Sequence, residues 1–165
     1  MRTPHADTTQ TSVLCALITV SDTRDETTDK SGQLMRSHLT KAGHTVSHCQ
    51  IIKDEPEQIA LLVRTLASRS DVQAILLNGG TGIAARDTTF DAITPLLEKE
   101  LPGFGEIFRQ LSYAEIGSRA IASRATAGIH NHTLIFSLPG SSKAVKLALE
   151  NLILPELRHL SSLLQ

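Results

Sequence analysis

The sequence predicts an open, doubly wound α/β sheet, in which parallel strands carry helices on both faces. Three short apolar segments, typical of strands, alternate with two segments of helical periodicity along residues 13–77. Two of the apolar segments, 13–20 and 72–77, are almost continuously apolar, as expected for strands that helices cover on both faces. No repeat or linker divides the 165 residues, so we expect one domain over 13–165 behind a flexible polar tail at 1–12.

The first half of the chain supplies the elements of this sheet in order. After the strand at 13–20, a helix follows a polar segment and ends near Gly43, a residue type common at helix C-terminal caps. The segment 44–52 partly alternates polar and apolar residues, which predicts a strand nearer an edge of the sheet. The next helix begins at Asp54, its expected N-cap, because a D-x-x-E capping box and Pro56 stand at its start.

The second half of the chain continues the alternation of helices and strands. Helical patterns predict helices over 88–100 and 104–124. Two shorter segments, 126–129 and 133–137, are expected to be strands joined by a turn. A long last helix follows, and Pro155 should kink it or limit its length because proline lacks a backbone N–H.

The composition excludes several classes of function. Lys and Arg total 16 and Asp and Glu total 17, which gives a net charge of −1 and no basic surface for nucleic acid. No apolar run is long enough to span a membrane, and the polar N-terminus lacks the apolar segment of a secretory signal, so we expect a cytoplasmic protein. Cys15 and Cys49 lie in apolar or strand-like segments, where we expect both to be buried.

Three loops should follow the carboxyl ends of strands: 21–29, 78–87 and 138–142. In open α/β sheets, ligands bind in the crevice outside these strand ends. The three loops are therefore the candidate functional site.

The most distinctive of these loops is rich in glycine. Its residues are Gly79, Gly80, Thr81 and Gly82. Glycines allow positive φ angles and let an anion approach backbone N–H groups, so the loop is either a phosphate-binding loop or a tight turn. No lysine follows it as in a P-loop, and Ala85 stands where a dinucleotide-binding loop usually has its third glycine.

Two acids are candidates for catalysis. Asp87 follows the glycine loop and could hold Mg²⁺ or orient a nucleophile, but it could equally cap a helix that begins near Thr88. For Asp54 the capping box is a sufficient structural explanation. Ser21 and Asp22 are ordinary turn residues apart from their position at the end of a strand.

The last loop leads into a helix N-terminus. Its residues are Pro139, Gly140 and Ser141. Free N–H groups and the helix dipole would favour an anion here, to which Lys143 would add positive charge. The alternative is a plain turn followed by a serine cap.

Together with several further motifs, these residues resemble a known family. The motifs are Thr19-Val20-Ser21-Asp22, Asp29-Ser31-Gly32, Gly79-Gly80-Thr81-Gly82, Arg86-Asp87, Gly103-Phe104-Gly105-Glu106, Phe108-Arg109, Ser112-Tyr113, Glu115-Ile116-Gly117, Ser123-Arg124-Ala125 and Leu138-Pro139-Gly140-Ser141. Their order and spacing over about residues 13–158 are similar to the MoaB/Mog family of molybdenum cofactor biosynthesis. The segment 104–125 is most similar to the MoaB branch.

The resemblance implies a three-layer α/β/α fold, a trimer or hexamer, and binding of molybdopterin, a pterin with a dithiolene and a terminal phosphate. Active members adenylylate that phosphate: it attacks the α-phosphorus of Mg-ATP, pyrophosphate leaves, and molybdopterin-AMP passes to a molybdenum insertion protein. The resemblance also implies that molybdopterin is the substrate, ATP the co-substrate and Mg²⁺ the metal.

The same resemblance implies roles for the candidate residues. Residues 79–82 would cradle phosphates, Asp87 would be the key acid through Mg²⁺ or by orienting the phosphate, and Asp54 would be a second acid. The pocket would be completed by Ser21, Asp22, Pro139, Gly140 and Ser141.

Two alternatives to the adenylylating enzyme remain. Some MoaB members bind without clear catalysis, so the chain could hold molybdopterin or a partner enzyme without turnover. An unrelated nucleotide-binding α/β protein is the third alternative, which the weak dinucleotide signature disfavours.

Overall fold

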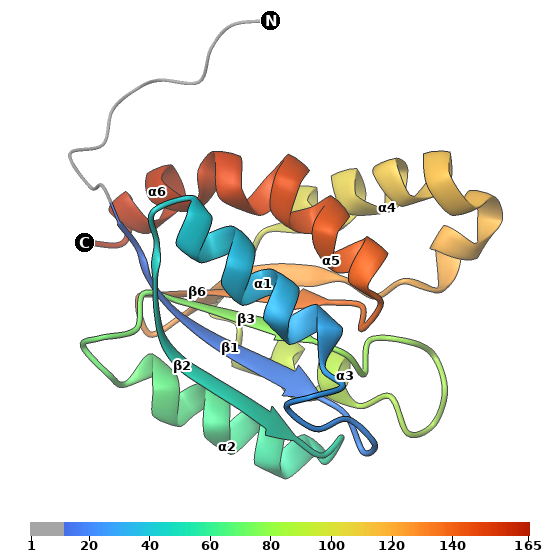
Figure 1. Ribbon diagram of the computed structural model, residues 1–165, viewed down its shortest axis with the longest axis horizontal. Coiled ribbons are helices and arrows are strands. Elements are labelled where there is room, and N and C mark those ends of the chain that lie inside the picture. Colours follow the sequence, from blue (N-terminus) through green and yellow to red (C-terminus); the bar gives the residue numbers. More distant parts are fainter. Residues whose placement is uncertain (1–11) are drawn as a thin grey trace, which may run out of the picture.

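The computed structural model describes residues 12–165, whose six strands form one mixed sheet between two helical layers (Figure 1). The strands are β1 (Leu14–Val20), β2 (Thr45–Ile52), β3 (Ala74–Asn78), β4 (Lys99–Glu100), β5 (Thr126–His130) and β6 (Thr133–Leu138). Their order is β2-β1-β3-β6-β5-β4, in which the first four are parallel and β5 and β4 continue antiparallel. The predicted three-layer α/β fold with a mostly parallel sheet is therefore confirmed, as is the edge position of β2.

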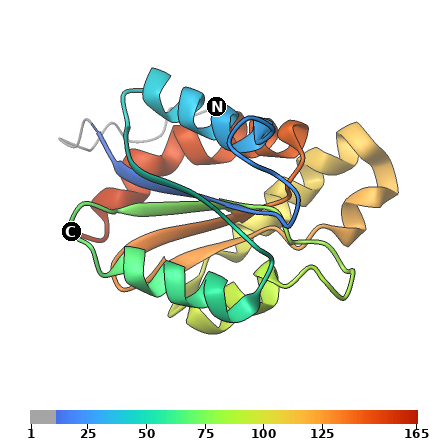
Figure 2. The same cartoon turned by 60° about the horizontal axis from the view of Figure 1, so that its bottom comes forward.

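Helices cover both faces of the sheet. They are α1 (Lys30–Lys41), α2 (Pro56–Ala67), α3 (Thr89–Ile93), α4 (Pro102–Ile116), α5 (Ser142–Ala148) and α6 (Leu154–Ser162), with short 3₁₀ or π-helical segments η1 (Thr94–Leu96), η2 (Gly117–Ala122) and η3 (Leu149–Ile153). The helices α1, α4, α5 and α6 lie on one face, and α2 and α3 lie on the other (Figures 1 and 2).

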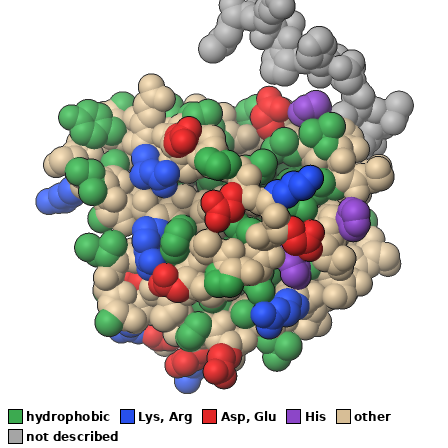
Figure 3. Space-filling model, turned by 180° about the vertical axis from the view of Figure 1, so that it is seen from behind, with side chains coloured by type: hydrophobic (Ala, Val, Ile, Leu, Met, Phe, Trp, Pro, Cys, Tyr) green, Lys and Arg blue, Asp and Glu red, His purple; other side chains and the backbone are tan. Residues whose placement is uncertain are grey.

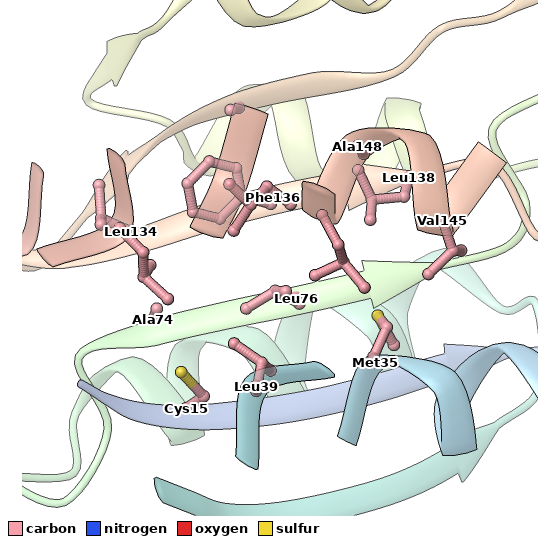
Figure 4. Packing of buried hydrophobic residues seen from close by; sticks show 14 of the residues in the cluster. Cys15, Met35, Leu39, Ala74, Leu76, Leu134, Phe136, Leu138, Val145 and Ala148 are labelled. Carbon is pink, nitrogen blue, oxygen red and sulfur yellow. The ribbon is translucent and has the colours of Figure 1, made fainter. Parts of the chain in front are cut away.

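Two apolar cores result from the alternation of side chains along each strand. In β1, Cys15 and Leu17 pack against α1, α4, α5 and α6, whereas Ala16 and Ile18 pack against α2 and α3. Figure 4 shows the first of these cores, where α1 contributes Met35 and other side chains come from β3, β6 and α5. Because β1 and β3 are covered on both sides, their nearly continuous apolar sequences are explained.

The two helices predicted over 88–100 and 104–124 are shorter than expected. The first is divided into α3, a 3₁₀ turn containing Pro95, and the edge strand β4, which pairs with β5 through Lys99 and Ile129. The second ends at Ile116, because Gly117 has a φ of 63° and breaks the helical hydrogen-bond pattern. A 3₁₀ segment occupies 117–122 instead.

The last helix is interrupted near Pro155, as expected, but it continues beyond the proline. A π-helical turn, η3, separates α5 from α6 just before this proline. Proline cannot donate the usual i→i−4 hydrogen bond, and a π turn is one way in which a helix adjusts to the missing donor. The chain thus continues as a helix on the same face of the sheet (Figure 1).

One expectation about the cysteines is wrong. Cys15 is fully buried, and burial raises the pKa of its thiol to about 12. Cys49 is exposed, because it lies on the edge strand β2, which lacks a neighbouring strand on one side. The expected tail at 1–12 lies outside the described residues except for Ser12, whose hydroxyl lies 3.3 Å from that of Thr45.

The surface of the molecule carries both signs of charge, as the even charge balance predicts. On the side opposite the view of Figure 1, acidic and basic side chains are interspersed with apolar ones (Figure 3). Within residues 12–165, every helix is too short or too polar to cross a bilayer.

Candidate functional site

A cavity of about 490 Å³ lies at the carboxyl ends of β1, β3 and β6. It is lined by the three loops that follow these strands, through Val20, Ser21, Thr23 and Arg24, through residues 79–82 and 139–141, and through Asp87. One wall comes from α4 through Phe108, Ser112 and Ile116, and the end of η2 with the residue after it adds Ala122 and Ser123. The chain passes from β1 to β2 on one side and then to β3 on the other, so the cavity adjoins the topological switch point of the sheet.

The glycine loop adopts a backbone that only glycine can supply. Gly79 and Gly80 have φ angles of 102° and 63°. A Cβ atom on Gly79 would lie 2.2 Å from the carbonyl oxygen of Val20, and one on Gly80 would lie 2.2 Å from Thr89 Oγ1. Within residues 12–165, the N–H groups at 80–82 donate to no acceptor, which leaves them available to an anion.

Asp87 lies at the cavity and does not cap a helix. Helix α3 begins at Thr89, and its N-cap residue Thr88 makes no side-chain capping hydrogen bond. Instead, Asp87 Oδ2 accepts a hydrogen bond of 3.2 Å from the N–H of Ala84 and lies beside Gly82. The half-buried carboxylate thus closes its own loop while lining the cavity.

Asp54 lies behind the glycine loop, outside the set of residues that line the cavity. The predicted capping box is wrong, because the N-cap residue of α2 is Glu55 and makes no side-chain cap. Asp54 Oδ1 instead accepts hydrogen bonds from the backbone N–H and the hydroxyl of Thr88, at 3.1 and 2.5 Å. A Cβ atom on Gly80 would lie 2.5 Å from Asp54 Oδ2, so this carboxylate backs the loop directly.

Asp22 joins these segments from outside the cavity. Its carboxylate forms an ion pair with Arg86 and accepts a hydrogen bond of 3.1 Å from the N–H of Asp54. The hydrogen bond from Asp54 and the Arg86 guanidinium lower the pKa of Asp22. Asp22 lines a neighbouring depression along β2 instead of the cavity. Its contacts toward the glycine loop are those with Arg86 and Asp54.

The loop after β1 and the turn after β6 meet across the cavity. Ser21 Oγ accepts hydrogen bonds from the N–H groups of Thr23 and Arg24, at 3.2 and 3.1 Å, and thereby shapes the first loop. Ser141 caps α5 as expected, since its side chain accepts from the N–H of Ala144 at 3.2 Å. Lys143 is exposed and does not line the cavity, so it does not supply the positive charge expected there.

Two arginines to which sequence reasoning gave no role hold this site. Arg24 lines the cavity and donates to the carbonyl oxygen of Gly140 at 3.0 Å. Arg124 donates to the carbonyl oxygens of Gly82, at 2.7 and 3.0 Å, and of Asp87, at 3.1 Å, and so fastens both ends of the loop between them. The position of Arg24 in the first strand-end loop was the available signal. Arg124 belongs to the motif Ser123-Arg124-Ala125, but its role could not be predicted because it is distant in sequence from the loop it holds.

The residues described by the structure offer limited ligands for a metal. Within residues 12–165, no three His, Cys, Asp or Glu side chains are grouped closely enough to hold an ion by themselves. Asp87 is the one carboxylate among the residues that line the cavity. A single carboxylate can still hold Mg²⁺ when phosphate oxygens and water complete the octahedron, and the cavity has room for such a ligand.

The fold and the cavity define an open α/β protein whose candidate ligand site lies at the carboxyl ends of parallel strands. The family model described as "Probable molybdopterin binding domain" matches residues 16–159. The chain therefore belongs to this family, and the resemblance to MoaB/Mog proteins is confirmed.

Individual relatives agree with this assignment. The chain is 60% identical over 148 residues to "Molybdenum cofactor biosynthesis protein B" of Bacillus subtilis, covering 89% of this chain and 87% of the relative. A crystal structure of a molybdenum cofactor biosynthesis protein B is 51% identical, with a TM-score of 0.90 over 93% of this chain and 96% of that one. The tungsten cofactor synthesizing protein MoaB of Pyrococcus furiosus is 38% identical, with a TM-score of 0.80 over 92% and 95% of the two chains.

Proposed function

We propose that this chain acts in molybdenum cofactor biosynthesis, where it binds molybdopterin and adenylylates its terminal phosphate with Mg-ATP. The observation that carries the proposal is the arrangement of Asp87 beside a glycine loop with unpaired N–H groups in one cavity. Family membership supports a pterin ligand, and the relatives named for molybdenum cofactor biosynthesis support the pathway.

The proposed reaction needs no nucleophile from the protein. An oxygen of the terminal phosphate attacks the α-phosphorus of ATP, the bond from that phosphorus to the β-phosphate oxygen breaks, and pyrophosphate leaves. Such a transfer depends on positioning and on neutralising phosphate charge. The N–H groups at 80–82 would hold phosphate oxygens, and the turn at 139–141 would complete the pocket.

The two acids would contribute differently to this reaction. Asp87 would hold Mg²⁺ jointly with phosphate oxygens, because it is the carboxylate at the cavity. Asp54 would act as the second acid by accepting hydrogen bonds from Thr88 and by packing against Gly80. These contacts would keep the loop in the backbone conformation that presents its N–H groups. Asp22 would contribute by holding Arg86 beside the loop.

The test is to incubate the protein with molybdopterin, ATP and Mg²⁺ and to look for molybdopterin-AMP by mass spectrometry. We expect the adduct with wild type and its loss in Asp87→Asn. Asp71→Asn is the matched control, because Asp71 pairs with Arg69 on the surface, outside the residues that line the cavity. The absence of an adduct from folded wild type would overturn the enzymatic proposal.

One observation favours a second candidate, a molybdopterin-binding protein without turnover. Only Asp87 among the acids lines the cavity, while Asp54 and Asp22 lie outside it. Separate titrations with molybdopterin and ATP distinguish the two candidates, since a pure pterin carrier would bind the pterin and show no affinity for ATP.

We also propose that the chain assembles with copies of itself into a trimer or hexamer and passes its product to a molybdenum insertion protein. Support for self-assembly comes from apolar side chains exposed on α4 and η2, where Tyr113 is 64% exposed and Ile121 is 83% exposed. Sedimentation or light scattering would measure the oligomeric state.

A further inference from the structure

The cavity contains one basic side chain among the residues that line it, and this is Arg24. The rest of the lining is made of glycines, hydroxyl-bearing residues, apolar residues and Asp87. From this and from the contacts below, we propose that Arg24 recognises the phosphate group of the ligand and that Asp29 is the positioning residue that holds its guanidinium in place. The inference deepens the proposed function and rests on it for the identity of the ligand.

The guanidinium of Arg24 is held where three strand ends meet. Its Nη2 donates to the carbonyl oxygen of Gly140 at 3.0 Å, and its Nη1 lies 3.5 Å from Asn78 Oδ1, at the end of β3. A guanidinium carries five N–H donors, and these contacts engage only one on each of its terminal nitrogens. The side chain is thus oriented toward the loops and retains donors for a ligand.

Asp29 orients the guanidinium of Arg24 without using its hydrogen-bond donors. Asp29 is 6% exposed, and its Oδ1 lies 3.8 Å from Arg24 Nη1, which is too long for a hydrogen bond. Both carboxylate oxygens are engaged elsewhere, since Thr19 Oγ1 donates to Oδ2 at 2.5 Å and the N–H of Gly32 donates to Oδ1 at 2.9 Å. The carboxylate therefore attracts the guanidinium while its own hydrogen bonds stay within the fold.

The network continues into the sheet, which fixes its geometry. Asn78 Nδ2 donates to Thr19 Oγ1 at 2.8 Å, so the end of β3 is joined to β1 below the cavity. Thr19 and Asn78 are both buried, and a buried network in which each member has partners is rigid. The guanidinium of Arg24 is consequently preorganised. This favours binding of a phosphate, whose charged oxygens can accept two parallel hydrogen bonds from one guanidinium.

The variants Arg24→Gln and Arg24→Lys test the role of the side chain, with Lys143→Gln as the matched control. Lys143 stands beside the same turn and carries the same charge, but it lies outside the cavity lining. The probes are molybdopterin, molybdopterin whose phosphate has been removed by a phosphatase, and inorganic pyrophosphate. Urea denaturation of each variant checks that it is folded.

We expect Arg24→Gln to weaken binding of molybdopterin by about 10- to 100-fold while affinity for the dephosphorylated pterin changes little. Arg24→Lys should recover part of the loss, because it keeps the charge but lacks the fork. Lys143→Gln should bind both pterins as wild type does. Equal losses for the two pterins in a folded Arg24→Gln variant, or no loss for either, would overturn the proposal.

Pyrophosphate separates this inference from the proposed function. If wild type binds pyrophosphate in a manner that requires Arg24 but binds no molybdopterin, the proposed ligand is wrong and the anion-recognition role of Arg24 stands. If wild type binds molybdopterin and Arg24→Gln binds both phosphate-bearing probes normally, the role of Arg24 is wrong and the proposed function stands.

A double-mutant cycle tests the positioning role of Asp29. We expect Asp29→Asn to reduce the discrimination between phosphorylated and dephosphorylated pterin by less than Arg24→Gln does. In the double variant the discrimination should fall no further than in Arg24→Gln alone, because Asp29 acts through Arg24. Additive losses of discrimination would show that Asp29 affects phosphate binding independently and would overturn its assignment.

Discussion

The two ends of the parallel strands use polar side chains in opposite ways. At the carboxyl ends, three loops place glycines, hydroxyl groups, Arg24 and Asp87 around a cavity of about 490 Å³. At the amino ends, polar side chains bind the backbone of a neighbouring strand instead. His44 Nδ1 accepts from the N–H of Val13 at 3.1 Å, and Gln73 Oε1 accepts from the N–H of Leu14 at 2.9 Å.

The difference shows which polar groups are available to a ligand. At the amino ends, the backbone N–H groups at the start of β1 are paired by side chains that lie across from them. At the carboxyl ends, the N–H groups at 80–82 have no acceptor within residues 12–165. Substitutions at the amino ends should therefore affect stability alone, whereas those at the carboxyl ends should affect binding as well.

The largest effect is expected from Gly80→Ala. The alanine would have to adopt the positive φ of this position, and its Cβ atom would lie 2.2 Å from Thr89 Oγ1. The free energy of unfolding should therefore fall by about 3–5 kcal/mol, and binding should be lost. Urea denaturation measures the first and pterin titration the second. Gly103→Ala is the control, because a Cβ atom there meets nothing within 4 Å. A Gly80→Ala protein as stable as wild type would contradict the structure of the loop.

Arg124→Met should have the next largest effect. It removes the hydrogen bonds to the carbonyl oxygens of Gly82 and Asp87 and the ion pair with Asp91, at a cost of about 2–3 kcal/mol in the free energy of unfolding. Because the freed loop carries Asp87, the proposed adenylylation should fall further than the loss of stability explains. Arg109→Met, which loses one hydrogen bond to Ala125 at 3.2 Å, is the control. Normal activity in Arg124→Met would show that the loop keeps its shape unaided.

Acidification should destabilise the amino ends through His44. Burial, followed by the nearby Arg158, lowers the pKa of His44 from 6.5 to about 4, so the folded protein keeps this ring neutral where the unfolded chain protonates it. Stability should therefore fall as the pH drops from 6.5 toward 4, with a loss of about 2 kcal/mol near pH 5. Urea denaturation at about pH 7 and pH 5 measures this loss, and His44→Gln should reduce it. An unchanged pH dependence in that variant would contradict the assignment.

The smallest effects are expected at Asp54, where two substitutions separate charge from hydrogen bonding. Asp54→Asn keeps an oxygen that can accept from Thr88, so its free energy of unfolding should fall by less than about 1 kcal/mol. Asp54→Ala loses both hydrogen bonds, so its free energy of unfolding should fall by about 1–2 kcal/mol and the proposed adenylylation should fall more than in Asp54→Asn. Equal activity losses in the two variants would show that the loop depends on the charge of Asp54.

The sequence predicts the fold more completely than the site. The strands β1 and β3 are evident as apolar segments because helices bury both of their faces, and Ser141 caps its helix as a local rule predicts. Asp54 satisfies an equally good capping rule, yet its carboxylate binds Thr88, 34 residues away, which only the folded chain brings near. The same reason hides the role of Arg124, whose partners at Gly82 and Asp87 are 42 and 37 residues distant.

Where β1, β3 and β6 end beside the cavity, main chain packs directly against main chain. The N–H of Gly79 donates to the carbonyl oxygen of Leu138 at 3.0 Å, and a Cβ atom on Gly79 would lie 2.2 Å from the carbonyl oxygen of Val20. This contact leaves no space for a side chain at Gly79. Selectivity among ligands should therefore be set by the side chains elsewhere in the cavity lining, such as those of Ser112 and Ser123.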